Sequence, residues 1–203
     1  LSSSSAASDV YKRQVWVVSY TYDDEGRETR QTHYDSQGRV DYTEVTEYQG
    51  ERAERMAYGA DGALRWRKKT VEYNDGDSIE TSYYYPDGNR IKTILEEFNQ
   101  RGQLVEENHI DEIGTVFRRI ENEYDELGRL TGRKVYNHRG EIHRRVWLEY
   151  LPHNHVGLVR QLILPENRVE EYRYRYKLDR RGVWVKREEI LLIRSGEGKL
   201  TLR

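Results

Sequence analysis

The chain has 203 residues, of which 34 are Lys or Arg and 36 are Asp or Glu, so its formal net charge at pH 7 is only −2. This length fits one domain or one repeat array, and the balanced charge lacks the basic footprint of a nucleic-acid-binding domain. Cysteine is absent, which excludes disulfides and thiol chemistry, and no apolar run approaches the roughly 20 residues that a membrane-spanning helix needs. We therefore expect no nucleic-acid partner and no membrane-spanning segment.

The composition is too polar for an ordinary globular core. Hydrophobic residues make up 35% of the chain and charged residues 34%, whereas a typical soluble domain is roughly 45–50% apolar. The chain nevertheless contains 17 Tyr and 4 Trp, and aromatic residues favour a pleated, half-buried surface. We expect a thin or elongated β structure in which most side chains contact water.

The first segment, residues 1–14, differs from everything that follows. Its sequence, LSSSSAASDVYKRQ, resembles the translated adapter read-through found at the edges of assembled environmental reads. We expect residues 1–14 to be a non-native or disordered leader, and the alternative is a flexible Ser-rich tail or linker.

Residues 15–150 carry a repeat that is marked by regularly spaced glycines. From Gly50 onward a shorter and a longer interval alternate between successive glycines, so that every second glycine is evenly spaced. Such a fixed period is the signature of a repeat architecture. The glycines are Gly26, Gly38, Gly50, Gly62, Gly76, Gly88, Gly102, Gly114, Gly128 and Gly140.

Most of these glycines share part or all of a turn motif. An apolar or aromatic residue precedes the glycine by four positions, Asp or Asn precedes it by three, and another apolar residue follows it by two. Asp at the first position of a type I turn, then Gly where φ must be positive, is typical of a three-residue hairpin loop with a bulge. This loop is predicted to place the Asp opposite the residue after Gly, and the aromatic residue opposite the apolar one. The clearest turns are Tyr34, Asp35, Gly38 and Arg39, and Tyr124, Asp125, Gly128 and Arg129.

Between turns there is room for a strand but not for a helix. We therefore predict an all-β fold, an antiparallel β-hairpin repeat array in the form of an elongated meander or an open coiled sheet. The alternation of shorter and longer glycine intervals would distinguish the two edges of this sheet. Residues 151–203 break the period, with Pro152 and Pro165 suited to loops or sheet edges, and are predicted to be variant repeats or a C-terminal cap.

Several turns carry a family motif. Residues 22–27 (YDDEGR), 34–40 (YDSQGRV) and 124–130 (YDELGRL) resemble YD repeats, the units of Rhs and related bacterial proteins, over about residues 20–190. MORN-like repeats are the second choice, on residues 83–88 (YYYPDG). The resemblance implies β-hairpin strips, which in long chains coil into hollow shells around a toxin and in others form surface or secreted proteins that contact carbohydrate. It also implies export to the periplasm, the cell surface or the medium, although no signal is visible in this sequence.

Titratable side chains carry little catalytic or metal-binding signal. His153 and His155 have a spacing that zinc or copper can use, but they follow Pro152 in a predicted loop, and we interpret them as solvated loop histidines. Paired glutamates such as Glu96-Glu97 and Glu106-Glu107 are interpreted as members of cross-strand charge ladders with Arg and Lys, not as a glycosidase pair. We predict no catalytic residue, no metal site and no cofactor, and a protein that is not an enzyme.

The aromatic residues exceed what the turns require. Rings on an open sheet can support a sugar ring or an apolar patch of a partner, and the alternative is that they form the buried strip that a chain poor in aliphatic residues otherwise lacks. Tyr alternates with cations over residues 172–177, which predicts three Tyr on one face of a strand and the cations on the other. The binding candidates are Trp66, Trp147, Trp184, Tyr172 and Tyr174.

Together these patterns predict a non-enzymatic β-repeat scaffold or surface-interaction module of an exported bacterial protein. One alternative is a carbohydrate- or protein-binding module with an exposed aromatic face, and another is a shell segment of a larger Rhs-type toxin. The partner is not identified by the sequence, and a glycan or a protein are the two candidates.

Overall fold

The computed structural model describes residues 17–181, 183–194 and 200–202. The predicted leader, residues 1–14, and the turn residue Gly182 lie outside this part of the chain. The described residues form one sheet of fifteen strands, in which each strand pairs antiparallel with its neighbours in sequence order. The predicted all-β antiparallel meander is confirmed.

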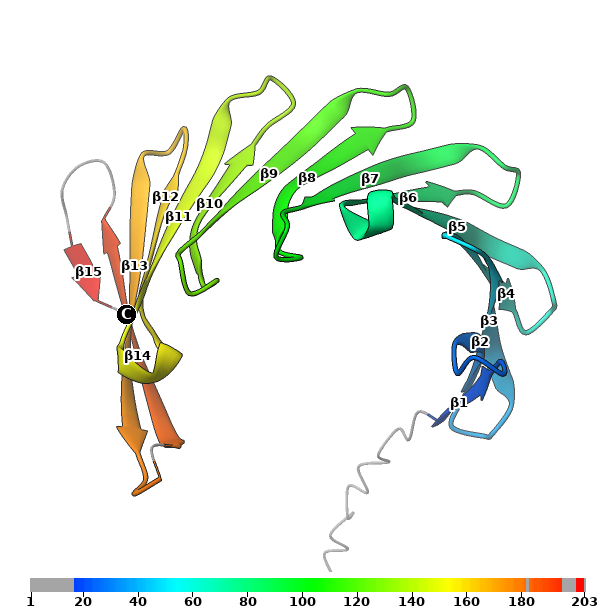
Figure 1. Cartoon of the computed structure of the whole chain (residues 1–203), viewed down its shortest axis with the longest axis horizontal. Coiled ribbons are helices and arrows are strands. Elements are labelled where there is room, and N and C mark those ends of the chain that lie inside the picture. The colour runs from blue at the N-terminus through cyan, green and yellow to red at the C-terminus, as the bar shows by residue number, and fades with distance from the viewer. Residues whose placement is uncertain (1–16, 182, 195–199, 203) are drawn as a thin grey trace, which may run out of the picture.

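Within the described residues, short connections join consecutive strands, and two of these connections contain 3-10 helices. The strands are β1 (Val17–Tyr22), β2 (Glu28–Tyr34), β3 (Val40–Gln49), β4 (Arg52–Gly59), β5 (Leu64–Tyr73), β6 (Ser78–Tyr84), β7 (Arg90–Phe98), β8 (Leu104–Asp111), β9 (Val116–Tyr124), β10 (Leu130–Tyr136), β11 (Ile142–Tyr150), β12 (Val156–Ile163), β13 (Arg168–Leu178), β14 (Trp184–Arg194) and β15 (Leu200–Leu202). The 3-10 helices are η1 (Asn74–Gly76) and η2 (Pro152–Asn154). Figure 1 shows that the sheet curls into an open arch, with β1 near one end and β13 to β15 at the other.

The predicted hairpin loop is present, as the turn between β9 and β10 illustrates. The backbone N–H of Gly128 donates to the carbonyl of Asp125 (2.9 Å), and Gly128 has φ +80°, a conformation that side chains with a Cβ rarely adopt. The Asp125 carboxylate accepts hydrogen bonds from the backbone N–H (2.9 Å) and the Nε (2.7 Å) of Arg129. Tyr124 lies opposite Leu130. The Asp and Arg pairing and the aromatic and aliphatic pairing are therefore both as predicted.

A bulge accompanies most of these turns. Between β9 and β10 the pairing passes from Tyr124 opposite Leu130 to Glu123 opposite Gly132, so Thr131 is an extra residue in the outgoing strand. Register shifts of this kind occur in ten of the fourteen strand pairings in the described residues. Bulges bend a strand and increase its twist, so their repetition contributes to the curvature of the arch.

The meander divides the turns between two rims. The turns at Gly26, Gly50, Gly76, Gly102 and Gly128 and the connections after β11 and β13 form the first rim. The turns at Gly38, Gly62, Gly88, Gly114 and Gly140 and the connection after β12 form the second rim. From Gly50 to Gly140, the shorter glycine interval leads from the first rim to the second, and the longer interval leads back. The alternation therefore distinguishes the two edges of the sheet, as predicted.

Alternation along the strands gives the sheet two faces, which we name after one residue on each. Residues that lie directly opposite each other on neighbouring strands point to the same face. The strand pairings therefore assign each residue to the Tyr48 face or to the Lys69 face. Most strand-end aromatics of the first rim lie on the Tyr48 face (Tyr48, Phe98, Tyr124, Tyr150 and Tyr176), with Tyr73 on the Lys69 face. The strand-end aromatics of the second rim lie on the Lys69 face (Tyr34, Tyr58, Tyr84 and Tyr136).

The buried interior is thin. Among the described residues the buried apolar side chains are Ala57, Ile120, Val135 and Ile163, and the buried polar ones are Thr81, Ser82, Thr93 and Asn122. Most other strand residues are half-buried. A single layer with both faces open explains why a chain with so few hydrophobic residues can form this sheet.

Candidate interaction surfaces

On the first rim, tyrosine hydroxyls connect each hairpin to the one before it. Four tyrosines each donate a hydrogen bond to a backbone carbonyl of the preceding hairpin, always at the same separation along the chain. The pairs are Tyr48 to Glu28 (3.0 Å), Tyr124 to Leu104 (2.8 Å), Tyr150 to Leu130 (2.9 Å) and Tyr176 to Val156 (2.9 Å). Because the acceptor is a backbone carbonyl, this contact tolerates any side chain at the accepting position.

Two of these tyrosines also support an arginine from the preceding turn. The guanidinium of Arg27 lies 4.5 Å from the ring centre of Tyr48, and that of Arg129 lies 4.6 Å from the ring centre of Tyr150. The turn carboxylate of Asp125 orients Arg129 through its Nε and through a 2.7 Å ion pair. Hydrogen bonds from the backbone N–H and then the side chain of Arg129 lower the pKa of Asp125. The turn motif therefore also joins neighbouring hairpins.

The structure brings together only some of the aromatic binding candidates that it describes. Trp66 in β5 lies on the Tyr48 face and Trp147 in β11 lies on the Lys69 face, six strands apart. The side chain of Trp184 lies outside what the structure describes. Tyr172 and Tyr174 do share the Tyr48 face of β13 with Tyr176, as the alternating sequence predicts.

Several of these rings already contact side chains of the same chain. The Arg145 guanidinium lies 5.1 Å from the ring centre of Trp147, and that of Arg187 lies 5.5 Å from Tyr174. The Tyr172 hydroxyl donates to Glu170 (2.9 Å), and burial is the largest cause of the raised pKa of Tyr172. Trp66 and Tyr172 are half-buried. The aromatic residues thus contribute to contacts between strands.

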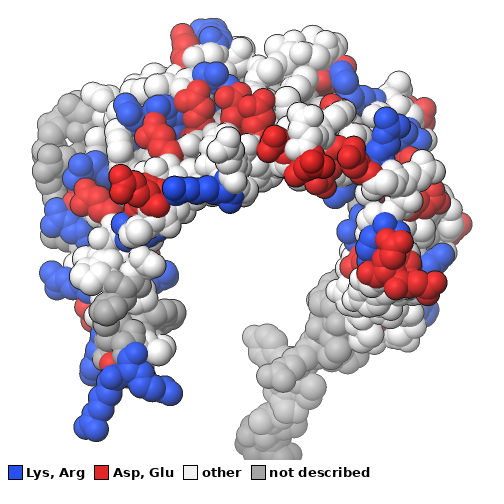
Figure 2. Space-filling model, viewed as in Figure 1, with Lys and Arg blue, Asp and Glu red and all other residues white. Residues whose placement is uncertain are grey.

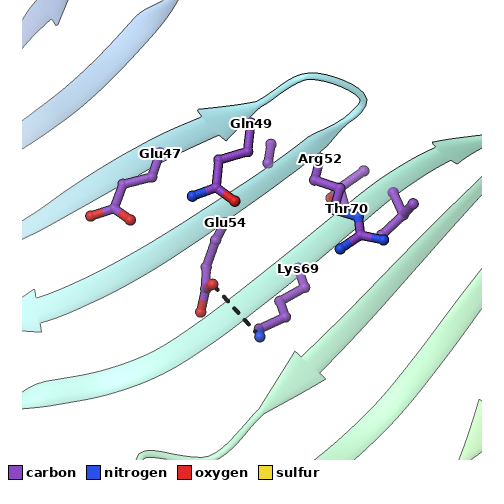
Figure 3. A pocket seen from close by; sticks show the side chains of 8 residues that line it. Glu47, Gln49, Arg52, Glu54, Lys69 and Thr70 are labelled. Carbon is purple, nitrogen blue, oxygen red and sulfur yellow. Dashed lines mark ion pairs between the residues drawn. The ribbon is translucent and has the colours of Figure 1, made fainter.

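A polar hollow of about 210 Å³ lies over β3, β4 and β5 (Figure 3). Its charged lining includes Glu47 and Glu54, which oppose each other across β3 and β4. Glu54 is held by Lys69 (3.7 Å) and by the Nε of Arg67 (3.3 Å). Sequence reasoning missed this hollow, because it depends on which strands lie side by side. Its paired charges are those of a hydrated sheet face.

The predicted charge ladder is wrong at β7 and β8. Glu96 lies opposite Glu107 and Glu97 opposite Glu106, so the glutamates of these two strands face each other and not Arg or Lys. Burial, and then the nearby Glu107, raise the pKa of Glu96, while His109 lowers it. The physical reason for the error is the register, which a bulge at Val105 sets. In the C-terminal hairpins the ladder does form, since Arg160 lies opposite Glu171 and pairs with it at 3.0 Å.

One of the two histidines that the sequence analysis interpreted as solvated loop residues, His155, packs against an aromatic ring. His155 follows η2 and stacks on the Tyr176 ring at a centroid distance of 4.8 Å, so it is not simply solvated. The His153 side chain lies outside what the structure describes. In residues 17–181, 183–194 and 200–202, no group of three or more His, Cys, Asp or Glu is placed to hold a metal ion. Within the same ranges no helix has the length and apolar character to cross a membrane.

Comparison with known proteins gives only distant likeness. No protein-family profile matches the chain, and no curated protein matches it. Among solved structures, a porin-like protein from Bacteroides uniformis aligns with a TM-score of 0.48 at 14% identity, over 96% of this chain and 91% of that one.

Two further solved structures align at lower scores. TcdB2-TccC3 without its hypervariable C-terminal region has a TM-score of 0.38 at 14% identity, over 89% of this chain and 9% of that one. TcdB2-TccC3-Cdc42 has a TM-score of 0.20 at 12% identity, over 92% and 15%. The chain thus spans only a small part of these two proteins. At such scores the likeness carries no argument about function.

Proposed function

We propose that this chain is a non-enzymatic β-repeat scaffold module of an exported bacterial protein, which holds a curved sheet surface in a fixed shape. The observation that carries the proposal is the recurring hydrogen bond from a first-rim tyrosine to the carbonyl of the preceding hairpin. Contacts that repeat between neighbours support an extended shape without a deep core, because each repeat needs only the repeats beside it. The resemblance of the turns to YD repeats supports export.

A second candidate function is recognition of a carbohydrate or a protein by aromatic rings. The row of Tyr172, Tyr174 and Tyr176 on one face of β13 favours it, because successive rings on one face can stack on a sugar or an apolar patch. The contacts of Tyr174 with Arg187 and of Tyr176 with His155 favour the scaffold, since they engage two of these three rings.

Binding of the full chain to a glycan panel separates the two candidates. Under the scaffold proposal, no glycan should give saturable binding that Trp66→Ala or Tyr172→Ala abolishes. Tyr73→Ala is the matched control, because Tyr73 is an exposed tyrosine (42%) away from β13. Saturable binding that is lost in Tyr172→Ala, kept in Tyr73→Ala and accompanied by unchanged melting curves would replace the scaffold with a recognition module.

The shell-segment alternative is tested by the DNA that flanks the coding region. Long-read sequencing that finds an export signal and further repeats upstream, and a non-repetitive toxin-like domain downstream, would make this chain part of a shell. A short gene with its own signal peptide would make it a stand-alone surface module. A gene without any export signal would contradict the exported part of the proposal.

A further inference from the structure

The near-zero net charge conceals two oppositely charged regions. Residues 17–124 contain 24 acidic and 14 basic residues, whereas residues 125–203 contain 11 acidic and 18 basic residues. The first region therefore has a formal charge of −10 and the second +7. Such asymmetry points to electrostatic recognition, even though the whole chain is balanced.

The basic charge is concentrated at the free end of the hairpin formed by β13 and β14. Residues 173–187 contain seven Lys or Arg and one acidic residue. β12 pairs with β13 only as far as Arg173, and β15 pairs with β14 only over residues 192–194. The end of the hairpin thus extends beyond the strands on either side of it, and Figure 2 shows its blue side chains at the lower left of the arch.

Like charges oppose each other on this hairpin. Lys177 lies directly opposite Lys186 on the Lys69 face, and Arg175, two residues away on the same face, lies opposite Glu188. These three side chains are on exposed residues, and Glu188 lies 2.8 Å from Lys186. Like charges directly opposite in a sheet are unfavourable, so an anionic partner would stabilise this arrangement.

The chain itself carries a matching anionic surface. Glu97, Glu106 and Glu121 are directly paired in a row across β7, β8 and β9, also on the Lys69 face. Lys134 (3.9 Å) and Arg119 (3.2 Å) compensate Glu121 at one end of the row. At the other end Glu97 is exposed. Here too, like charges face each other.

The two surfaces cannot neutralise each other within one molecule. β8 and β13 are five strand steps apart in the sheet, which at about 4.8 Å a step is about 24 Å. Charges in water are largely screened beyond about 8 Å at physiological salt. A second molecule could bring the opposite charges together, and the small overall charge of −2 opposes such an approach only weakly.

We propose that the basic end of the β13–β14 hairpin of one molecule docks on the acidic β7–β9 surface of a second copy of this chain. The inference rests on the proposed scaffold role, because self-association would extend the sheet surface that a single arch provides. It goes beyond that role by naming the partner and the contact. Its test measures association between copies, whereas the scaffold proposal is tested by glycan binding, so either can fail without the other.

Sedimentation velocity of the full chain tests the proposal. We expect concentration-dependent association at 50 mM NaCl that is at least tenfold weaker at 500 mM NaCl. A basic-to-acidic variant, Lys177→Glu with Lys186→Glu, and an acidic-to-basic variant, Glu97→Lys with Glu106→Lys, should each be monomeric. An equimolar mixture of the two variants should associate again, because each then supplies the charge that the other lacks.

The control for net charge is Arg139→Glu with Arg144→Glu, two exposed arginines outside the hairpin and away from Glu97 and Glu106. It changes the charge by the same amount as the hairpin variant and should keep association within twofold of the parent chain. Circular dichroism melting curves establish that all variants fold. A parent chain that stays monomeric at 50 mM NaCl, or a mixture that does not associate, would overturn the proposal. Binding of heparin or DNA by such a monomeric chain would assign the hairpin to a different polyanion.

Discussion

The rims and the strand centres of this sheet differ in how regularly their side-chain contacts repeat. On the first rim the same contacts recur from hairpin to hairpin, such as the Asp125 to Arg129 pair and the hydrogen bond from Tyr150 to the Leu130 carbonyl. In the strand centres each hairpin is different, since β7 and β8 oppose glutamates whereas β12 and β13 pair Arg160 with Glu171.

This difference shows where the fold is specified and where the surface is free to vary. The rims fix turn geometry, register and the spacing of neighbouring hairpins, so they should tolerate few substitutions. The strand centres lie on a single layer with both faces open, so their charges can change with small effects on folding. Substitutions of the rim turn residues should therefore cost more free energy of unfolding than changes of charge at solvent-accessible positions in the strand centres.

The largest effect is expected for Gly128→Val on the first rim. Gly128 has φ +80°, and a Cβ built there would lie 3.1 Å from the amide nitrogen of Gln103. A β-branched residue is strained in this conformation, so the free energy of unfolding should fall by roughly 1–3 kcal/mol. Thermal or urea unfolding measures the loss. Gly128→Asn is the matched control and should cost less, because Asn tolerates positive φ, whereas equal losses in both variants would argue against backbone strain as the cause.

The next effect concerns the rim tyrosines. Tyr150→Phe removes the hydroxyl that donates to the Leu130 carbonyl at 2.9 Å, which should cost about 1 kcal/mol. On the second rim, the one hydrogen bond of the Tyr58 hydroxyl within the described residues goes to the sulfur of Met56 at 3.3 Å, a weak acceptor. Tyr58→Phe should therefore change the unfolding midpoint in urea very little. Equal losses in the two variants would contradict the separate role that we assign to the first rim.

A smaller, pH-dependent effect is expected for Asp125→Asn. The Arg129 N–H groups lower the pKa of Asp125 in the folded protein, so the charged carboxylate stabilises the fold above the unfolded pKa of about 3.9. This stabilisation is lost as the pH falls through the folded pKa. The stability difference between parent and variant should therefore be present at pH 7 and shrink below about pH 4. Asn99→Ala is the control, because Asn99 bonds the neutral Gln103 side chain and its cost should not follow this pH dependence.

Much of the rim could be predicted from the sequence. The glycine spacing predicted the hairpins, and the Asp and Arg positions predicted the turn pairs, because these depend only on residues close together in the chain. The tyrosine contacts were missed, since their acceptor is a backbone carbonyl and no side-chain pattern marks it. The even spacing of Tyr124, Tyr150 and Tyr176 was the one available signal.

The strand centres could be predicted less well, for a physical reason. A bulge makes Val105 an extra residue in β8, and this shift determines that Glu97 meets Glu106. Without the bulge, every later residue of the strand would face the opposite side of the sheet. The separation of acidic and basic regions could have been predicted by counting charges in each part of the sequence. The row of Glu97, Glu106 and Glu121 could not, because it depends on the register of three strands.

The smallest change in the free energy of unfolding is expected in these strand centres, where one substitution should increase stability. Glu106→Gln removes one charge from the opposed pair with Glu97 while keeping an oxygen that can accept from the Asn108 amide (2.7 Å), so it should raise the free energy of unfolding by about 0.2–1 kcal/mol. Glu171→Gln makes the same chemical change where the carboxylate bonds both Arg160 and Arg173, so it should lower stability. Urea unfolding at 20 mM and 500 mM NaCl measures both variants, and the two effects should shrink toward zero as salt screens the charges. The same sign for both substitutions would mean that side-chain volume or strand propensity outweighs charge, and that the register of β7 and β8 does not place the two glutamates face to face.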